Sequence, residues 1–194
     1  GGLCIVSVSC AGQRGKKEVQ KQPNIVFLLA DDLRWNSLNC MGNKLLHTDN
    51  IDELAENGIR FTNACVTTSI SMVSRASILT GQYMSRHKIR EFGKSLSEQA
   101  FVETYPAILR RAGYWTGFVG KYGVGQIRES DFDFAREYER VHWFPLENGD
   151  SIHVTERNAL DALEFLGERP KDKPFLLSVS FFATHAQDNH PDQY

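Results

Sequence analysis

The sequence lacks most of the features that mark specialised protein classes. Only 4 of its 194 residues are cysteine and 6 are proline, which excludes a disulfide-stapled scaffold and a proline-rich disordered chain. A net charge of -2 gives no support to nucleic-acid binding, and no internal repeat is visible. The remaining composition, 41% hydrophobic and 24% charged, is that of an ordinary globular protein, over a length that suits one domain or a large piece of one.

The first ten residues are uncharged and mostly apolar. At about 1.5 Å of rise per residue, they are far too short to span a hydrocarbon core of roughly 30 Å. The run ends at Cys10, and a polar, mostly basic stretch follows as far as residue 23. This pattern predicts the end of a secretory signal. The junction Val8-Ser9-Cys10-Ala11 is similar to that of a bacterial lipoprotein, although Ser7 stands where leucine is usual.

We therefore interpret residues 1–23 as the remnant of a secretory or lipoprotein signal followed by a flexible tether. On this interpretation the protein is exported, and is either periplasmic or a membrane-anchored bacterial lipoprotein with its lipid on Cys10. A disordered N-terminus or a buried edge strand is the alternative for the same residues.

Three apolar runs predict buried strands, at residues 24–30, 114–120 and 174–183. Unbroken apolar runs are typical of parallel strands that are covered on both faces. Helical patterns lie between them, and this alternation predicts an α/β fold with a mainly parallel sheet flanked by helices. The helices expected are residues 51–57 with Asn50 as cap and Gly58 in the left-handed conformation at the end, residues 104–112 ended by Gly113, and one that Thr155 opens and Gly167 and Pro170 stop.

Polar residues follow each apolar run. Asp31 and Asp32 come after the first, Lys121 after the second and His185 after the third. Because ligands collect beyond the carboxyl ends of the strands in such sheets, we expect these side chains to meet at one rim. The two carboxylates would supply part of a Ca²⁺ shell, which needs about six to eight oxygens. An Asp–Asp turn that only caps a helix is the alternative for that pair.

The segment 71–81 is typical of a loop that runs into a short helix ended by Gly81. The start of a helix carries unpaired backbone N–H groups and the positive end of its dipole, which together favour an anion. Arg75, one turn into this helix, adds a planar cation suited to oxyanions.

This segment, Ser71-Met72-Val73-Ser74-Arg75-Ala76-Ser77-Ile78-Leu79-Thr80-Gly81, resembles the signature of the type I, formylglycine-dependent sulfatases of the alkaline-phosphatase-like superfamily. That signature has Cys or Ser at its first position, usually Pro at the third, then Ser and Arg, with Leu-Thr-Gly following. The resemblance extends in the family's order over most of residues 23–190. The matching segments are residues 23–32, which end in Asp31-Asp32, and residues 50–52, 58–64, 120–121 and 181–185.

The resemblance implies that Ser71 is oxidised to Cα-formylglycine by a separate maturation enzyme. The hydrated aldehyde would attack sulfur, displace the alcohol and then expel sulfate. The resemblance also implies that Asp31 and Asp32, together with position 71, hold one Ca²⁺ ion.

Three further residues receive roles from the resemblance. Arg75 would be the partner of the formylglycine and the metal site, and Lys121 and His185 would contact the sulfate or the leaving group. Elementary chemistry agrees, because cations must offset the charge of a sulfate ester as charge develops on the leaving oxygen. An imidazolium at His185 would be able to protonate that oxygen.

The chain departs from the family pattern at three positions. Ser71 indicates either a serine-type sulfatase, which needs its own kind of maturation enzyme, or a cysteine that has been replaced. Val73 stands where proline is usual. Gly123 stands where the family usually has the histidine that takes a proton from the diol, and no spacing argument selects His142, His153 or a residue outside the chain in its place.

We therefore expect residues 24–194 to be the N-terminal part of a sulfatase catalytic domain, with the remaining metal ligands downstream of residue 194. The expected activity is removal of sulfate from a sulfated carbohydrate. One alternative is a phosphoester or phosphonate hydrolase of the same superfamily. Another is an inactive lipoprotein that binds sulfated glycans, which Ser71 and Gly123 together favour.

Overall fold

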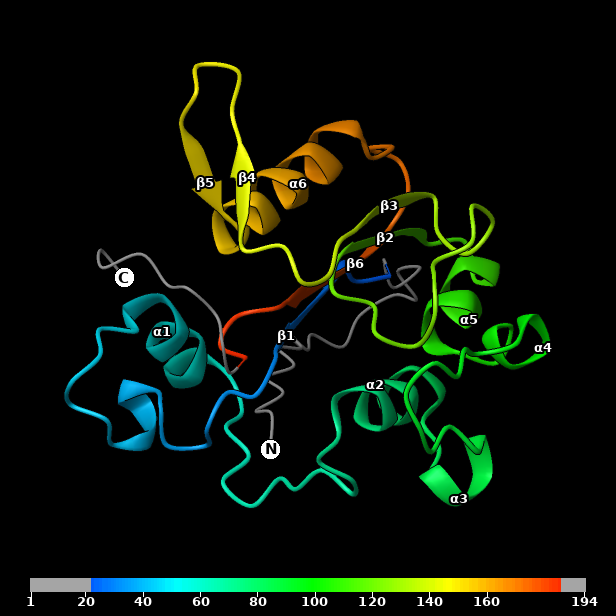
Figure 1. The fold of residues 1–194 in the computed structure, drawn as a ribbon, viewed down its shortest axis with the longest axis horizontal. Coiled ribbons are helices and arrows are strands. Elements are labelled where there is room, and N and C mark those ends of the chain that lie inside the picture. The colour runs from blue at the N-terminus through cyan, green and yellow to red at the C-terminus, as the bar shows by residue number, and fades with distance from the viewer. Residues whose placement is uncertain (1–21, 186–194) are drawn as a thin grey trace, which may run out of the picture.

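A four-stranded parallel sheet forms the centre of the computed structural model, which describes residues 22–185 (Figure 1). The predictions for the signal remnant and for Cys10 lie outside the described residues. The sheet has the order β1-β6-β2-β3, and every neighbouring pair is parallel, which confirms the predicted fold class. Its strands are β1 (Ile25–Ala30), β2 (Trp115–Gly120), β3 (Phe134–Glu137) and β6 (Phe175–Phe181).

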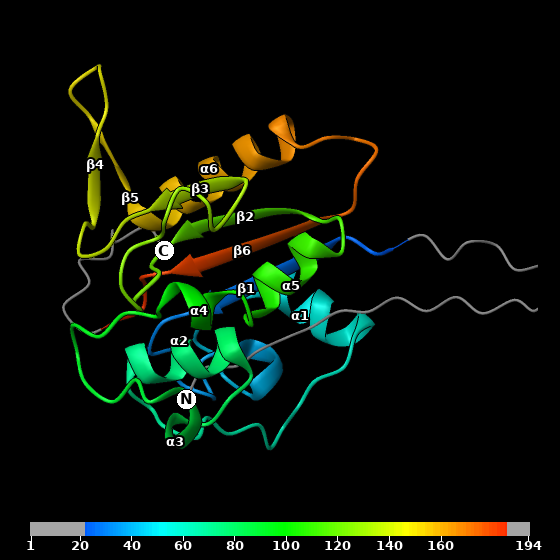
Figure 2. The same cartoon turned by 90° about the vertical axis from the view of Figure 1, so that its right-hand side faces the viewer.

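Helices cover both faces of the sheet (Figure 2). Helix α6 (Val154–Glu168) lies on one face, and α2 (Ser71–Thr80) and α5 (Tyr105–Arg111) lie on the other. The two faces have separate apolar clusters because alternate residues of β2 point in opposite directions. Phe118 packs in the cluster that includes α2, whereas Val119 packs in the cluster around Phe165 of α6.

The remaining elements are short. An antiparallel ribbon of β4 (Trp143–Pro145) and β5 (Ser151–His153) stands away from the main sheet (Figures 1 and 2). The sequence pattern indicates neither these strands nor β3, because three or four residues are too few to show a period. The other elements are η1 (Asn39–Met41), α1 (Asp49–Asn57), α3 (Met84–His87) and α4 (Glu98–Phe101).

Two of the three glycines that were expected to end a helix in the left-handed conformation do so. Gly81 and Gly113 have φ of 65° and 94°, the left-handed region that glycine enters without a Cβ penalty. The prediction for Gly58 is wrong, because the chain leaves α1 in an extended conformation with φ of -128°. The predicted cap of this helix is also wrong, since α1 begins at Asp49 and so includes Asn50.

Helix α6 begins one residue before the predicted start. The side chain of His153 accepts the backbone N–H of Thr155 at 3.3 Å, so a histidine serves as the cap. The helix passes through Gly167 and ends at Glu168, so this glycine does not stop it.

The register of the sheet sets the place of the site. Ala30 pairs with Phe181 and Gly120 pairs with Ser180, so β1, β6 and β2 end at nearly the same level. The residues that follow these strands therefore meet at one edge, as the sequence predicts.

Two further findings bear on the sequence interpretation. Cys40 and Cys65 are both free and do not form a disulfide with each other. Among residues 22–185, no helix is long and apolar enough to cross a bilayer.

Candidate active site

Asp31 is buried between two cations at the carboxyl end of β1. Its exposed fraction is 6%. Nζ of Lys121 lies 2.5 Å from its Oδ2, and Nη2 of Arg75 lies 3.5 Å from its Oδ1. Burial alone would raise the pKa of Asp31, but the charges of Arg75 and Lys121 outweigh burial and hold this pKa below its ordinary value. Asp31 is therefore a carboxylate at neutral pH.

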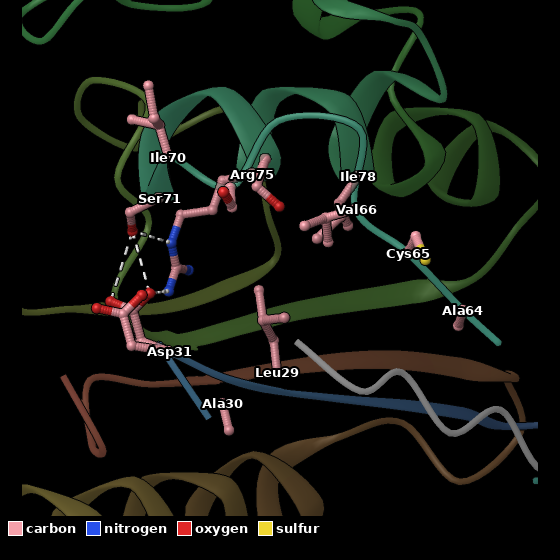
Figure 3. Close-up of a pocket in the computed structure, with 13 residues that line it drawn as sticks. Leu29, Ala30, Asp31, Ala64, Cys65, Val66, Ile70, Ser71, Arg75 and Ile78 are labelled. Carbon is pink, nitrogen blue, oxygen red and sulfur yellow. Dashed lines mark hydrogen bonds and ion pairs between the residues drawn. The ribbon is translucent and has the colours of Figure 1, made fainter. Parts of the chain in front are cut away.

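Ser71 is the first residue of α2 and points its hydroxyl at Asp31 (Figure 3). Its Oγ donates to Oδ1 of Asp31 at 3.1 Å and accepts from Nε of Arg75 at 3.3 Å. The preceding residue, Ile70, makes no side-chain cap, so the first N–H groups of the helix are not satisfied by one. The hydroxyl thus lies at the positive end of a helix and between groups of opposite charge.

Arg75 is held rigidly beside this hydroxyl. It is 4% exposed, and its Nη1 donates both to the backbone carbonyl of Lys121, at 2.6 Å, and to Oγ of Ser180. Burial lowers the pKa of Arg75, while the carboxylates of Asp31 and Glu139 act in the opposite direction. Nothing in the sequence marks Ser180 as part of the site, because it lies within an apolar run where a buried serine is ordinary strand composition.

Asp32 and His185 form an outer pair at the same edge. Nε2 of His185 lies 3.8 Å from Oδ2 of Asp32, whose side chain is 54% exposed. The His185 ring stacks on Phe182, with centroids 5.2 Å apart. Nζ of Lys121 lies 4.9 Å from the centroid of the same phenyl ring. The structure therefore brings every predicted site residue to one edge of the sheet.

Two adjoining cavities open at this edge, and Ser71 and Asp32 line both. The smaller one, about 200 Å³, lies between β1 and α2 and contains the Asp31–Arg75 contact (Figure 3). The larger one has a volume of about 730 Å³. Ser69 and Ile70 also line both cavities, and the lining of the larger one adds Met72, Phe92, Lys121, Gly123, Glu139, Arg140, His142, Phe182 and His185.

Gly123 lies against Arg75, in a backbone conformation that favours glycine. Its φ is +71°, and a Cβ at this position would lie 2.7 Å from Cδ of Arg75 and 3.6 Å from Oε1 of Glu139. The site therefore has no room for a side chain at position 123 unless Arg75 moves. Glu139 also lies close to the space that such a side chain would enter.

The structure distinguishes the two histidines that the sequence left open. His142 lines the larger cavity, and its ring lies 5.1 Å from that of Phe182. His153 is 2% exposed, packs against Trp143 and caps α6. Of these two, His142 is the one placed to meet a ligand in this cavity.

The residues at this edge fit a hard cation as part of its shell. Asp31, Asp32 and Ser71 offer oxygen atoms, the donor type that Ca²⁺ prefers. Within residues 22–185, no group of three or more His, Cys, Asp or Glu side chains is arranged to hold a metal ion. Lys121 neutralises Oδ2 of Asp31. A complete shell would therefore require ligands besides these three.

Comparisons with known proteins point to one family. The family model described as Sulfatase matches residues 23–194. An N-acetylglucosamine-6-O-sulfatase from Bacteroides thetaiotaomicron is 31% identical over 197 residues, which cover 91% of this chain and 33% of that protein.

Solved structures extend the match to three dimensions. A protein in complex with its substrate D-glucosamine-2-N,6-O-disulfate has a TM-score of 0.74 and 30% identity, and the match covers 86% of this chain and 35% of that one. The phosphonate monoester hydrolase of Agrobacterium radiobacter has a TM-score of 0.66 at 20% identity, over 82% of this chain and 41% of that one, and shows the shared fold alone. The chain spans about a third of the length of the first two relatives.

Proposed function

The chain belongs to the sulfatase family, and we propose that this protein is a sulfuric ester hydrolase that acts on a sulfated carbohydrate. One observation carries the proposal. The hydroxyl of Ser71, at the signature position, contacts both Asp31 and Arg75 at the start of a helix, beside Lys121. The names of the relatives favour a 6-O-sulfated hexosamine as the sugar.

The positive charges at the site suit a sulfate group. Arg75 and Lys121 offset the charge of the ester, and both lie within contact of Ser71 or of its acceptor Asp31. Because hydrogen bonds fix Arg75 from three sides, it loses little freedom when an oxyanion binds. A Ca²⁺ ion held by Asp31, Asp32 and position 71 would supply Lewis-acid stabilisation.

His185 is suited to protonate the leaving oxygen. Its ring is held against Phe182 and near the carboxylate of Asp32, on the wall of the larger cavity. In its imidazolium form it supplies the proton that the sugar oxygen requires as it departs.

Conversion of Ser71 to formylglycine by a maturation enzyme is part of the proposal. Serine alone is a weak nucleophile unless a base activates it. Formylglycine supplies a hydrated aldehyde, whose second hydroxyl allows sulfate to be expelled. We therefore expect protein with intact Ser71 to bind sulfate esters without turnover.

The test combines mass spectrometry of the peptide that contains Ser71 and Arg75 with a sulfate-release assay on the full-length protein. Release of sulfate over many turnovers, in proportion to the aldehyde content, supports the proposal. Multiple turnover by protein whose peptide contains only serine contradicts it.

Two rivals are tested with the same protein. Parallel rates on sulfate and phosphate monoesters of one alcohol separate a sulfatase from a phosphoester or phosphonate hydrolase, a candidate that has the same fold. A silent glycan-binding protein is favoured by Ser71 and by the closed space at Gly123. Protein with Ser71→Cys, matured in a competent host, that binds glycan but releases no sulfate would establish this second rival.

We also propose that the protein is exported and that Cys10 bears a lipid anchor. Metabolic labelling with palmitate, compared between the natural protein and a Cys10→Ala variant, tests this. Label that persists in the variant contradicts the proposal.

A further inference from the structure

The larger cavity has more room than a sulfate group needs. Its volume of about 730 Å³ is in the range of pockets that hold a whole small ligand, about 300–1,000 Å³. Ser71, Lys121 and His185 line the part where the sulfate ester is expected. Glu139 and Arg140 belong to a different segment, just after β3, and line the same cavity.

Arg140 is an exposed cation on this second segment. Its side chain forms no ion pair or hydrogen bond with any residue in the described range 22–185. The neighbouring Glu139 lies instead close to Gly123 and interacts electrostatically with Arg75. The guanidinium of Arg140 is therefore available to a ligand.

The backbone of Arg140 is strained, and no helix end accounts for the strain. Its φ is 58°, a conformation that is uncommon for residues other than glycine. Lys88 has a similar φ of 63°, but it ends α3, where a left-handed residue is the ordinary conclusion of a helix. Arg140 ends no helix, and strain of this kind gathers at ligand sites.

We propose that Arg140 binds a second anionic group, a sulfate or a carboxylate, on the sugar whose sulfate ester lies at Ser71. A guanidinium matches the paired oxygens of either group with two parallel hydrogen bonds. The protein is thereby selective for sugars with two anionic groups over sugars with one. This inference rests on the proposed function, because the first anion defines where the sugar lies.

The test measures binding and so does not depend on maturation of Ser71. Isothermal titration calorimetry at fixed salt gives Kd of the full-length protein for glucosamine 6-sulfate and for glucosamine 2-N,6-O-disulfate. The variant is Arg140→Asn, because asparagine tolerates the left-handed conformation and keeps the fold. Lys88→Asn is the matched control, since Lys88 is an exposed cation with a left-handed backbone outside the lining of the cavity.

We expect Arg140→Asn to weaken binding of the disulfate about tenfold, as loss of one exposed charge-assisted contact implies, and binding of the monosulfate less than about twofold. Arg140→Lys restores the charge without the planar fork and recovers part of the loss. Lys88→Asn changes neither constant.

Three results would overturn the inference: equal weakening of both sugars, no weakening of either, or a natural protein that does not prefer the disulfate. Failure of the proposed function looks different. In that case the binding preference and its loss in Arg140→Asn persist, while fully matured protein releases no sulfate from either sugar.

Discussion

Nζ of Lys121 and Oδ2 of Asp31 lie 2.5 Å apart, although 90 residues separate them in the chain. The pair is buried, so the charge of Lys121 depends on Asp31 for compensation, whereas the charge of Asp31 is compensated by both Lys121 and Arg75. This contact joins the ends of β1 and β2, two strands that are not neighbours in the sheet. The candidate site therefore links two strands that the sheet itself does not pair.

The first prediction tests this pair with a double-mutant cycle. Lys121→Met leaves Asp31 with Arg75 alone, and we expect it to lower the free energy of unfolding by about 3 kcal/mol. Adding Asp31→Asn should recover part of that loss, with a coupling of about 2 kcal/mol. Urea unfolding of the four full-length proteins measures the cycle, and strictly additive losses would show that the two groups are not coupled.

The second prediction concerns Gly123. Gly123→Ala places a Cβ 2.7 Å from Cδ of Arg75 in a strained backbone, so we expect a loss of about 3 kcal/mol and at least roughly tenfold weaker binding of a sulfate ester. Gly149→Ala is the matched control, with φ of +89° and no atom within 4 Å of the added Cβ. It should cost about 1 kcal/mol of backbone strain and leave binding unchanged. Urea unfolding and calorimetry measure the free energy of unfolding and the binding of the sulfate ester for both variants. Equal effects of the two substitutions would mean that Arg75 moves aside at no cost in stability or binding.

The third prediction is that Ca²⁺ stabilises the full-length protein through Asp32. At a free concentration of about 100 times Kd, the ion should add about 2.7 kcal/mol of stability and raise Tm, and a chelator should reverse this. Asp32→Asn should abolish most of the shift. Asp172→Asn removes an exposed carboxylate before the opposite end of β6 and should retain the shift in full. An unchanged response in Asp32→Asn would exclude this residue as a ligand.

The fourth prediction is a pH dependence of stability that arises from His87. Burial lowers the pKa of His87 below its ordinary value of 6.5. Its Nδ1 accepts the N–H of Ile89 at 3.1 Å, and its Nε2 lies 3.0 Å from Oγ of Ser77, contacts that suit a neutral ring. His87 therefore binds a proton more tightly in the unfolded chain than in the folded protein. The contribution of the neutral His87 ring to the free energy of unfolding is complete above pH 6.5 and is lost as the pH falls through the lowered native pKa.

Urea unfolding at a series of pH values from about 7.5 down to about 5 measures this effect. His87→Gln should flatten the profile over this range, whereas His47→Gln, at an exposed histidine, should leave it unchanged. If the two variants behave alike, His87 is not the group responsible.

The centre of the site could be predicted because two general rules coincide there. Buried parallel strands are visible as unbroken apolar runs, and ligands lie beyond their carboxyl ends. Asp31, Lys121 and His185 each follow such a run, so their meeting point needed no knowledge of the tertiary structure. The start of α2 added Arg75 through the chemistry of helix termini, whereas Ser71 was singled out only by the resemblance to the sulfatase signature.

The far side of the cavity could not be predicted in this way. Glu139 and Arg140 follow β3, a strand of 4 residues that shows no period in the sequence. The left-handed conformation at position 140 could not be predicted, because the residue there is arginine and not the glycine that usually marks such a conformation in a sequence. His142 and His153 look alike in the sequence, and only the fold of the ribbon after β3 turns one toward the cavity and the other into the core.

The central place of β6 has a consequence for the order of events during synthesis. Because β6 lies between β1 and β2, the sheet cannot close until Phe181 has been made. The edge of the sheet at which Ser71 lies therefore remains incomplete while about 110 further residues are added, which takes roughly 5–20 s at the usual rates of translation. An enzyme that modifies position 71 in an extended chain has this interval in which to act, and a faster-closing sheet would shorten it.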